Sequence, residues 1–167
     1  MKLFKKLAAA VLVAALALMM VGCGGSKTGL AQQIKDAVSD TAVIMQGKQA
    51  TDSKELDALA AKLLTEIDKA LAESEEGKRP DPNVLLNDEE FLKKVGIDPA
   101  KDAYVVSLES VPSYLSNTMN QIKPIELASR LLNGDFAIGA PRIGSKFEFG
   151  LAIGTLDGES WALMLMK

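Results

Sequence analysis

Apolar residues recur at helical spacing in the first half of the chain. Residues 30–46 keep their large apolar side chains near one helical face, and Gly47 is suited to end that helix. Residues 52–74 follow the i, i+3, i+4 spacing more closely, with Asp52 as the expected N-cap and Glu55 in the capping-box position. The apolar positions are Leu30, Ile34, Val38 and Met45 in the first segment and Leu56, Leu59, Ala60, Leu63, Ile67, Ala70 and Leu71 in the second. The pattern therefore predicts two amphipathic helices.

The middle of the chain is divided by polar and proline-containing residues. Residues 75–83 predict a loop. A short helix is expected over residues 88–95, with Asn87 as its N-cap and Gly96 as its stop. These short elements connect the two amphipathic helices to the β-rich part of the chain.

β-Branched residues then become frequent. Residues 103–111 form a short segment rich in such side chains, which favours a strand. Proline fits the first turn of a helix, so residues 112–122 and 124–133 predict two short helices, or one helix broken at the proline between them. Residues 136–144 are expected to add a further strand or a bulged edge, because Pro141 cannot donate to a ladder.

The last segment has a period of two. Residues 146–167 predict a β-hairpin, in which Asp157 and Gly158 supply the positive φ angles of a type I′ turn. In the first strand Phe147, Phe149, Leu151 and Ile153 alternate with Glu148, Gly150, Ala152 and Gly154, and in the second Trp161, Leu163 and Leu165 alternate with Ala162, Met164 and Met166. Strands that are apolar on both faces are buried on both faces. The small residues of the first strand would let a helix approach closely.

The order of elements is helix, helix, short helix, strand, helices and hairpin, and the chain has no internal repeat. Helices thus lie in the N-terminal half and a β-hairpin lies at the C-terminus. We therefore expect an α+β fold, a three-layer α-β-α sandwich with a small antiparallel sheet. Residues 30–167 are long enough to form it as a single domain.

The first 22 residues have the layout of a secretory signal peptide, which is a basic start, an apolar run and a small residue. Lys2, Lys5 and Lys6 precede an unbroken apolar run over residues 7–21. Such a run spans about 22 Å as a helix, less than a bilayer core of about 30 Å. A cleaved signal over residues 1–22 is therefore favoured over a membrane-spanning helix.

Met20-Val21-Gly22-Cys23 resembles the lipobox of bacterial lipoproteins, with Met where Leu is usual. The resemblance implies cleavage between Gly22 and Cys23 and a diacylglyceryl thioether on Cys23, which becomes an N-terminus acylated by chains such as palmitate. Two or more acyl chains anchor a protein stably. Residues 23–29 are rich in Gly and Ser and are expected to form a flexible tether. The alternative is a free or buried thiol that lies near a cleavage site by chance.

Cysteine content and charge narrow the choice of partner. Cys23 is the only cysteine, so an intrachain disulfide is excluded. Without residues 1–22 the chain has 16 basic and 22 acidic residues, a formal charge of −6. This charge argues against nucleic acid and against anionic lipid as charge-driven partners. The expected membrane contact is through acylated Cys23, on the extracytoplasmic face of the cell membrane or of an outer membrane.

Side chains suited to catalysis are few. The chain has no histidine, which excludes Ser-His-Asp and Cys-His catalysis and most zinc and copper sites. Glu109 is the one candidate cleft residue, because it ends the strand over residues 103–111 beside Ser107 and Ser110. A hydrogen-bonded structural role is the alternative for Glu109. No catalytic residue and no cofactor is therefore assigned.

A second group of acids lies at a loop and the helix start that follows it: Asp81, Asp88, Glu89 and Glu90. Carboxylates could hold a hard cation there. However, acids at a helix N-terminus are already favoured by the helix dipole. We therefore predict no metal site.

The order of elements and several stretches resemble the CAP superfamily, the cysteine-rich secretory and pathogenesis-related proteins. Residues 55–67 look like the second helix of that family, and residues 104–111 are similar to its Glu-Asn-Ile strand, with Glu109 at the glutamate. Residues 126–136 resemble its His-Arg-x-Asn-Leu-Leu-Asn segment, and residues 149–166 resemble its closing hairpin.

The resemblance implies a CAP-like domain over residues 30–167. Many members of the family line a cleft with paired histidines and glutamates that can hold a divalent metal. Here Leu127 stands at the second histidine, nothing replaces the first, and only Glu109 is kept. The resemblance thus implies a degenerate member without the metal cleft, and the alternative is an unrelated α+β lipoprotein with a three-layer build.

Together these features predict a membrane-anchored bacterial lipoprotein with a non-catalytic extracytoplasmic domain that binds another envelope or extracellular protein. A large exposed apolar patch would support this function. A small apolar ligand is a variant, and it requires an enclosed apolar pocket. The alternatives are a carboxylate-dependent hydrolase of cell-envelope material, which needs two converging acids, and a structural subunit of an envelope assembly.

Overall fold

The computed structural model describes residues 27–74, 80–111 and 123–167. The elements are α2 (Lys27–Gln46), β1 (Gln49–Asp52), α3 (Lys54–Glu73), α4 (Pro82–Leu85), α5 (Glu89–Val95), β2 (Tyr104–Ser110), α6 (Lys123–Asn133), β3 (Phe136–Ile138), β4 (Lys146–Leu156) and β5 (Glu159–Met166). Most of the helical residues precede the long hairpin, so the predicted α+β class is confirmed.

Several predicted features lie wholly or partly outside the described residues. These are the signal segment 1–22 with Gly22, the lipidation site Cys23 with the tether as far as residue 26, residues 75–79 of the expected loop, and the helix expected over residues 112–122. The rest of the expected tether, residues 27–29, belongs to α2, and the last two residues of the expected loop begin α4. Within the described ranges, no helix combines the length and the apolar character that crossing a bilayer requires.

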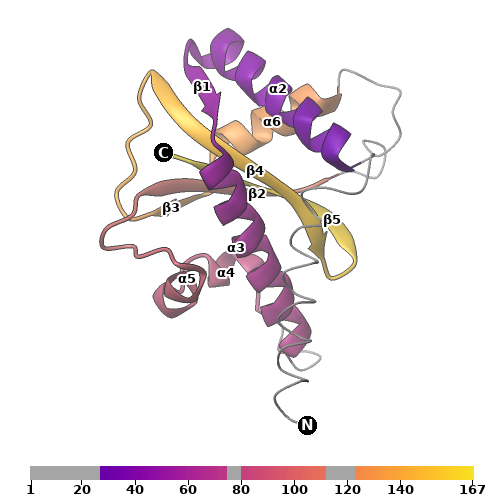
Figure 1. Ribbon diagram of the computed structural model, residues 1–167, viewed down its shortest axis with the longest axis vertical. Helices are drawn as coiled ribbons and strands as arrows, with labels where there is room; N and C mark the ends of the chain where they lie inside the picture. The colour runs from indigo at the N-terminus through magenta and orange to yellow at the C-terminus, as the bar shows by residue number, and fades with distance from the viewer. Residues whose placement is uncertain (1–26, 75–79, 112–122) are drawn as a thin grey trace.

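The strands of the described chain form one five-stranded sheet in the order β1-β4-β5-β2-β3 (Figure 1). The pairs β4–β5, β5–β2 and β2–β3 are antiparallel. β1 pairs parallel with β4, from Gln49 opposite Lys146 to Asp52 opposite Phe149. The expected antiparallel sheet therefore gains a parallel edge strand. Sequence pattern does not predict β1, because four residues of which one is half-buried give no period-two signal.

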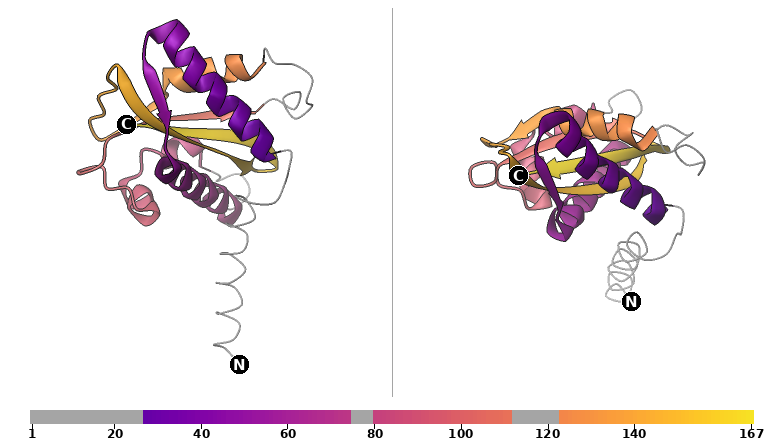
Figure 2. Two further views of the ribbon diagram at one scale, coloured as in Figure 1. Left: turned by 45° about the horizontal axis from the view of Figure 1, so that its top comes forward. Right: turned by 90° about the horizontal axis from the view of Figure 1, so that it is seen from above.

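Helices cover both faces of the sheet, which confirms the three-layer build (Figure 2). α2 and α6 pack on one face, and α3, α4 and α5 pack on the other. β5 lies inside the sheet and contributes to both cores. Leu163 and Leu165 point to the α3 side, while Met164 and Met166 point to the α2 and α6 side. This explains why the sequence of β5 is apolar at successive positions, on both faces of the strand.

The turn of the hairpin is also as predicted. Asp157 and Gly158 have φ angles of 52° and 83°. Both values lie in the left-handed region that a type I′ turn requires. Gly150 and Gly154 of β4 face α3, and their lack of a side chain lets this helix lie close to the sheet.

Two helix starts differ from prediction by one residue. Ser53 precedes α3 as its N-cap, whereas Asp52 ends β1. Asp88 caps α5 in place of Asn87, and its Oδ1 accepts a hydrogen bond from the backbone of Glu90 at 2.8 Å. Each pair of neighbours contains two residue types that cap helices well, so residue type does not choose between them.

Candidate functional site

Glu109 lies near the end of β2, as predicted, but it faces a cation. Its Oε2 is 3.3 Å from Nη1 of Arg130 on α6, and its side chain is 20% exposed. Burial raises the pKa of Glu109, a shift that the charge of Arg130 opposes and that of Asp135 reinforces. The neighbouring Ser107 is buried and donates its hydroxyl to the backbone carbonyl of Leu131 at 2.5 Å.

These contacts tie β2 to α6, and they favour the structural role for Glu109 over the cleft role. A two-acid hydrolase places two carboxylates on either side of the scissile bond. The closest charged partner of Glu109 is instead the Arg130 guanidinium, whose Nε is buried without a hydrogen-bond partner among the described residues. Glu109 also lines neither of the two pockets described below.

The acids of the second group, at Asp81 and over residues 88–90, make contacts within α4 and α5. Asp81 accepts a hydrogen bond from the backbone of Asn83 at 2.9 Å at the start of α4. On α5, Glu89 forms an ion pair with Lys93 at 3.3 Å. Over residues 27–74, 80–111 and 123–167, no three or more His, Cys, Asp or Glu side chains are grouped so that they could hold a metal ion.

A partly buried charge cluster that the sequence does not predict joins the two helical layers at the β1 edge. Lys35 of α2, 12% exposed, contacts Asp52 of β1 at 2.9 Å and also Asp57 of α3. Asp57 in addition accepts a hydrogen bond from the backbone N–H of Leu151 at 2.8 Å. Burial is the largest influence on Lys35 and lowers its pKa, but the hydrogen bonds and charges of Asp57 and Asp52 together raise it above 10.5. The cluster thus clamps α2 and α3 across the sheet edge.

Exposed apolar side chains gather where the end of α2 meets α6. Val43, Ile44 and Met45 are 55%, 81% and 66% exposed. The Met45 sulfur is 4.0 Å from the hydroxyl of Ser129 on α6. One helical turn before Ser129 on α6, Ile125 is also 50% exposed. We name Val43, Ile44, Met45 and Ile125 the α2–α6 patch.

The exposure of Met45 corrects the prediction that it lies on the buried face of α2. Ile34 and Val38 on that face are fully buried as expected. The last turn of α2 extends past Ala42, the last residue of this helix in the core, and Met45 lies instead beside Ser129 of α6. Three successive apolar residues were the available signal, because neighbours 100° apart on a helix cannot all face one core.

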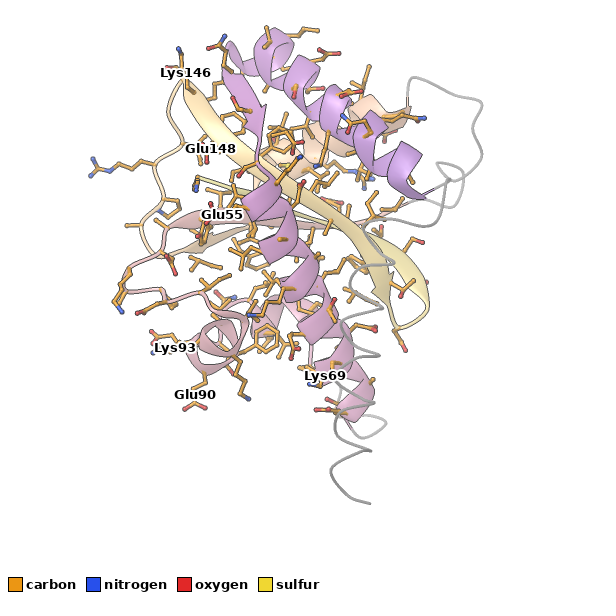
Figure 3. All side chains as sticks on the ribbon, viewed as in Figure 1. Glu55, Lys69, Glu90, Lys93, Lys146 and Glu148 are labelled. Atoms are coloured by element: carbon orange, nitrogen blue, oxygen red, sulfur yellow. The ribbon has the colours of Figure 1, made fainter. Side chains whose placement is uncertain are left out.

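Two open pockets lie elsewhere on the described surface. One of about 390 Å³ lies between the end of α3, the start of α4 and the hairpin turn, and includes Trp161. The other, of about 500 Å³, lies at the opposite end of β4, where Lys146 and Glu148 are found (Figure 3). Neither pocket is an enclosed apolar cavity, so neither meets the requirement of a lipid or small apolar ligand carrier.

No protein-family model, no curated protein and no solved structure matches this chain. The resemblance to the CAP superfamily and the lipoprotein interpretation of residues 1–23 therefore stay predictions.

Proposed function

We propose that this chain is a membrane-anchored bacterial lipoprotein whose body binds a partner protein of the cell envelope through the α2–α6 patch. The observation that carries the proposal is the exposure of three successive apolar residues, Val43, Ile44 and Met45, at one end of α2. Exposed apolar surface of this kind is typical of contacts between proteins. The lipobox-like segment ending at Cys23 supports the anchor.

The position of the patch favours a protein over the bilayer as its partner. Lipidated Cys23 would be four residues from Lys27, a distance of at most about 14 Å. Ile44 is about 25 Å further along the axis of α2. The exposed acids Asp36 and Asp40 lie between the two ends of the helix. Laying α2 flat on an anionic lipid surface would bring these carboxylates against it, so the patch is expected to face away from the membrane.

The two other functions that the sequence left open receive less support. The hydrolase alternative needs two carboxylates that converge in an open cleft, whereas Glu109 forms an ion pair with Arg130 and lines neither of the two described pockets. A structural subunit of an envelope assembly would also use an apolar surface, and it differs from a binding module in having a fixed stoichiometry. Measuring that stoichiometry separates these two proposals.

Photo-crosslinking in the producing cell tests the patch. A photoreactive amino acid at Ile44 should form a protein adduct, whereas the same residue at Gln33, exposed on the same helix, should not. Replacing Val43 and Met45 with Ser should abolish the adduct. An adduct with lipid, or equal adducts from both positions, would contradict the proposal. An adduct of twice the chain mass would identify a second copy as the partner.

The anchor is tested separately by mass spectrometry of the processed chain. We expect an acylated N-terminal Cys23, and a Cys23→Ser variant that leaves the membrane fraction. An unmodified thiol on a processed chain would overturn the anchor without affecting the patch.

A further inference from the structure

The short strand β1 forms one edge of the described sheet. It pairs with β4 on its inner side, and it runs along the sheet between α2 and α3 (Figure 2). Its residues are exposed, apart from half-buried Ala50. An accessible edge strand can pair with a strand of another chain. The direction of its backbone groups decides which pairing fits.

The ladder with β4 determines which residues of β1 direct their backbone outward. The N–H of Gln49 donates at 2.8 Å to the carbonyl just before β4, and the N–H of Ser53 donates to a carbonyl of β4 at the same distance. Residues of a strand alternate in the neighbour that their backbone groups face, so Gln49, residue 51 and Ser53 bond to β4. The N–H and C=O groups of Ala50 and Asp52 therefore point away from the sheet.

Opposite charges lie on either side of Ala50. Lys48 directly precedes β1, and Asp52 ends it. Asp52 contacts Lys35 of α2 at 2.9 Å, yet 41% of its side chain stays exposed. The N–H of Lys48 donates to the carbonyl of Ala42 at 3.0 Å, which leaves its own carbonyl for the edge. The segment from Lys48 to Asp52 thus has a charge pattern that is complementary to itself when reversed.

We propose that β1 pairs antiparallel with β1 of a second copy of this chain, so that the two sheets join into one. A two-fold axis at Ala50 places Lys48 of each copy opposite Asp52 of the other, and opposite charges facing each other across two strands are stabilising. The two Ala50 residues exchange both backbone hydrogen bonds, and each Asp52 N–H donates to the Lys48 carbonyl opposite it. Both copies use the same surface, so the assembly closes as a dimer.

Other registers of the same pairing fit less well. An axis at Thr51 brings Lys48 opposite Lys54, and an axis at Asp52 places two aspartates opposite each other. Like charges in these positions are destabilising. An axis at Gln49 requires the N–H of Lys48, which the end of α2 already binds. The register about residue 50 alone combines the available donors with favourable charges.

The inference goes beyond the proposed function, and either can fail alone. Met45 of the α2–α6 patch lies beside α6, whereas Lys35 lies on the side of α2 that reaches β1. A partner at the patch and a second copy at β1 therefore use different sides of α2. Variants that prevent β1 pairing should leave the adduct from a photoreactive residue at Ile44 unchanged.

Disulfide formation in the complete chain tests the register. In Ala50→Cys the two thiols face each other across the axis, where the Cα atoms of a hydrogen-bonded pair are about 5.5 Å apart, within the range of about 4.4–6.8 Å that a disulfide allows. Treating intact producing cells with a membrane-permeant oxidant should give a covalent product of twice the chain mass. The parent chain is oxidised in parallel to show any product formed through Cys23.

Thr51→Cys is the matched control. Thr51 is more exposed than Ala50, so random collision would favour it, but in this register it does not face its own copy. Its dimer yield should be lower by about fivefold or more, because the two Cα atoms lie beyond disulfide reach. No dimer from Ala50→Cys, or an equal yield from Thr51→Cys, would overturn the inference. A mixed disulfide with another protein would reject a second copy as the partner.

Two further measurements test the charges and the backbone bonds. Lys48→Glu places a like charge opposite Asp52 and should lower the dimer yield of Ala50→Cys about threefold or more, while Lys94→Glu, the same charge change at an exposed position of α5, should not. Equal effects of the two would reject the register. Amide hydrogen exchange of the chain with its native β1 should slow at Ala50 and Asp52 as protein concentration rises, but not at Gln49. Exchange at Ala50 that is independent of concentration would contradict the pairing.

Discussion

Gly150 of β4 lies against the backbone of Leu56 in the first turn of α3. A Cβ atom at position 150 would stand 2.2 Å from the carbonyl carbon of Leu56 and 2.3 Å from the backbone nitrogen of Asp57. These are main-chain atoms, which cannot rotate away as the end of a side chain can. The contact therefore sets how closely α3 approaches the sheet, and with it the packing of the core on that side.

Replacing Gly150 with Ala should thus destabilise the fold. We expect the free energy of unfolding to fall by about 3 kcal/mol or more, because α3 must shift away from β4. Urea denaturation gives the value. Gly144→Ala is the matched control, since its Cβ would meet nothing closer than 3.6 Å, and its change should stay within about 0.5 kcal/mol. Similar losses at the two positions would show that close approach is not the reason for glycine at 150.

Asp57 supports a second prediction, because it holds both Lys35 and a backbone donor. Asp57→Ala leaves the N–H of buried Leu151 without its acceptor and removes one partner of Lys35. The free energy of unfolding should fall by about 2 kcal/mol or more. Asp57→Asn keeps a side-chain oxygen for Leu151, so it should cost less.

The control for Asp57 is an exposed ion pair on the same helix. Oε2 of Glu66 lies 3.8 Å from Nζ of Lys69. Glu66→Ala should change the free energy of unfolding by less than about 1 kcal/mol. If Glu66→Ala lowers the free energy of unfolding as much as Asp57→Ala does, the contacts of Asp57 stabilise the fold no more than an exposed ion pair.

Much of the fold can be predicted from the sequence because the signal is local. The hairpin follows from an Asp-Gly turn between two apolar strands, and α3 follows from its helical spacing. β1 cannot be predicted in this way. Its pairing partner, β4, begins 97 residues after it, and its own burial pattern is almost wholly exposed. The parallel edge is determined by tertiary contacts alone.

For the candidate sites, too, the sequence predicts what depends on one element and not what depends on partners from other elements. Glu109 was placed correctly at the end of a strand, but its ionic partner Arg130 lies on another element, so its role followed only from the structure. Met45 was predicted to be buried because helical periodicity shows which face points inward and not where the core ends. The role of Lys35 is likewise not visible in the sequence, since both of its aspartates come from other elements.

The contribution of Glu109 to the free energy of unfolding should fall as the pH rises. Its pKa in the folded state is raised above 4.5, mainly by burial. The folded state then binds more protons than the unfolded state in the pH range above 4.5, and the Glu109 contribution to stability falls as pH rises through that range. Glu109→Gln removes this dependence. The unfolding free energy of the variant minus that of the parent should therefore increase from about pH 4 to about pH 7.

Urea denaturation of both proteins at several pH values measures this difference, and the carbon chemical shift of the Glu109 carboxyl group gives the titration directly. The attraction of Arg130 acts on the charged form of Glu109, so it is already contained in the net upward shift of the pKa and does not reverse the trend. A difference that decreases with pH would mean that Arg130 outweighs burial, so that the pKa of Glu109 lies below its usual value.

The α2–α6 patch leads to a prediction that separates binding from folding. Ile44 is 81% exposed, so Ile44→Gln removes few packing contacts and should change the free energy of unfolding by no more than about 0.5 kcal/mol. Val38→Ala, six residues earlier and fully buried on the same helix, should cost about 2 kcal/mol or more because it leaves a cavity. If the patch is a binding surface, the crosslinking yield from a photoreactive residue at position 125 should fall with Ile44→Gln despite unchanged stability. A stability loss from Ile44→Gln as large as that from Val38→Ala would mean that this side chain is covered within the molecule, and it would remove the basis for a partner at this surface.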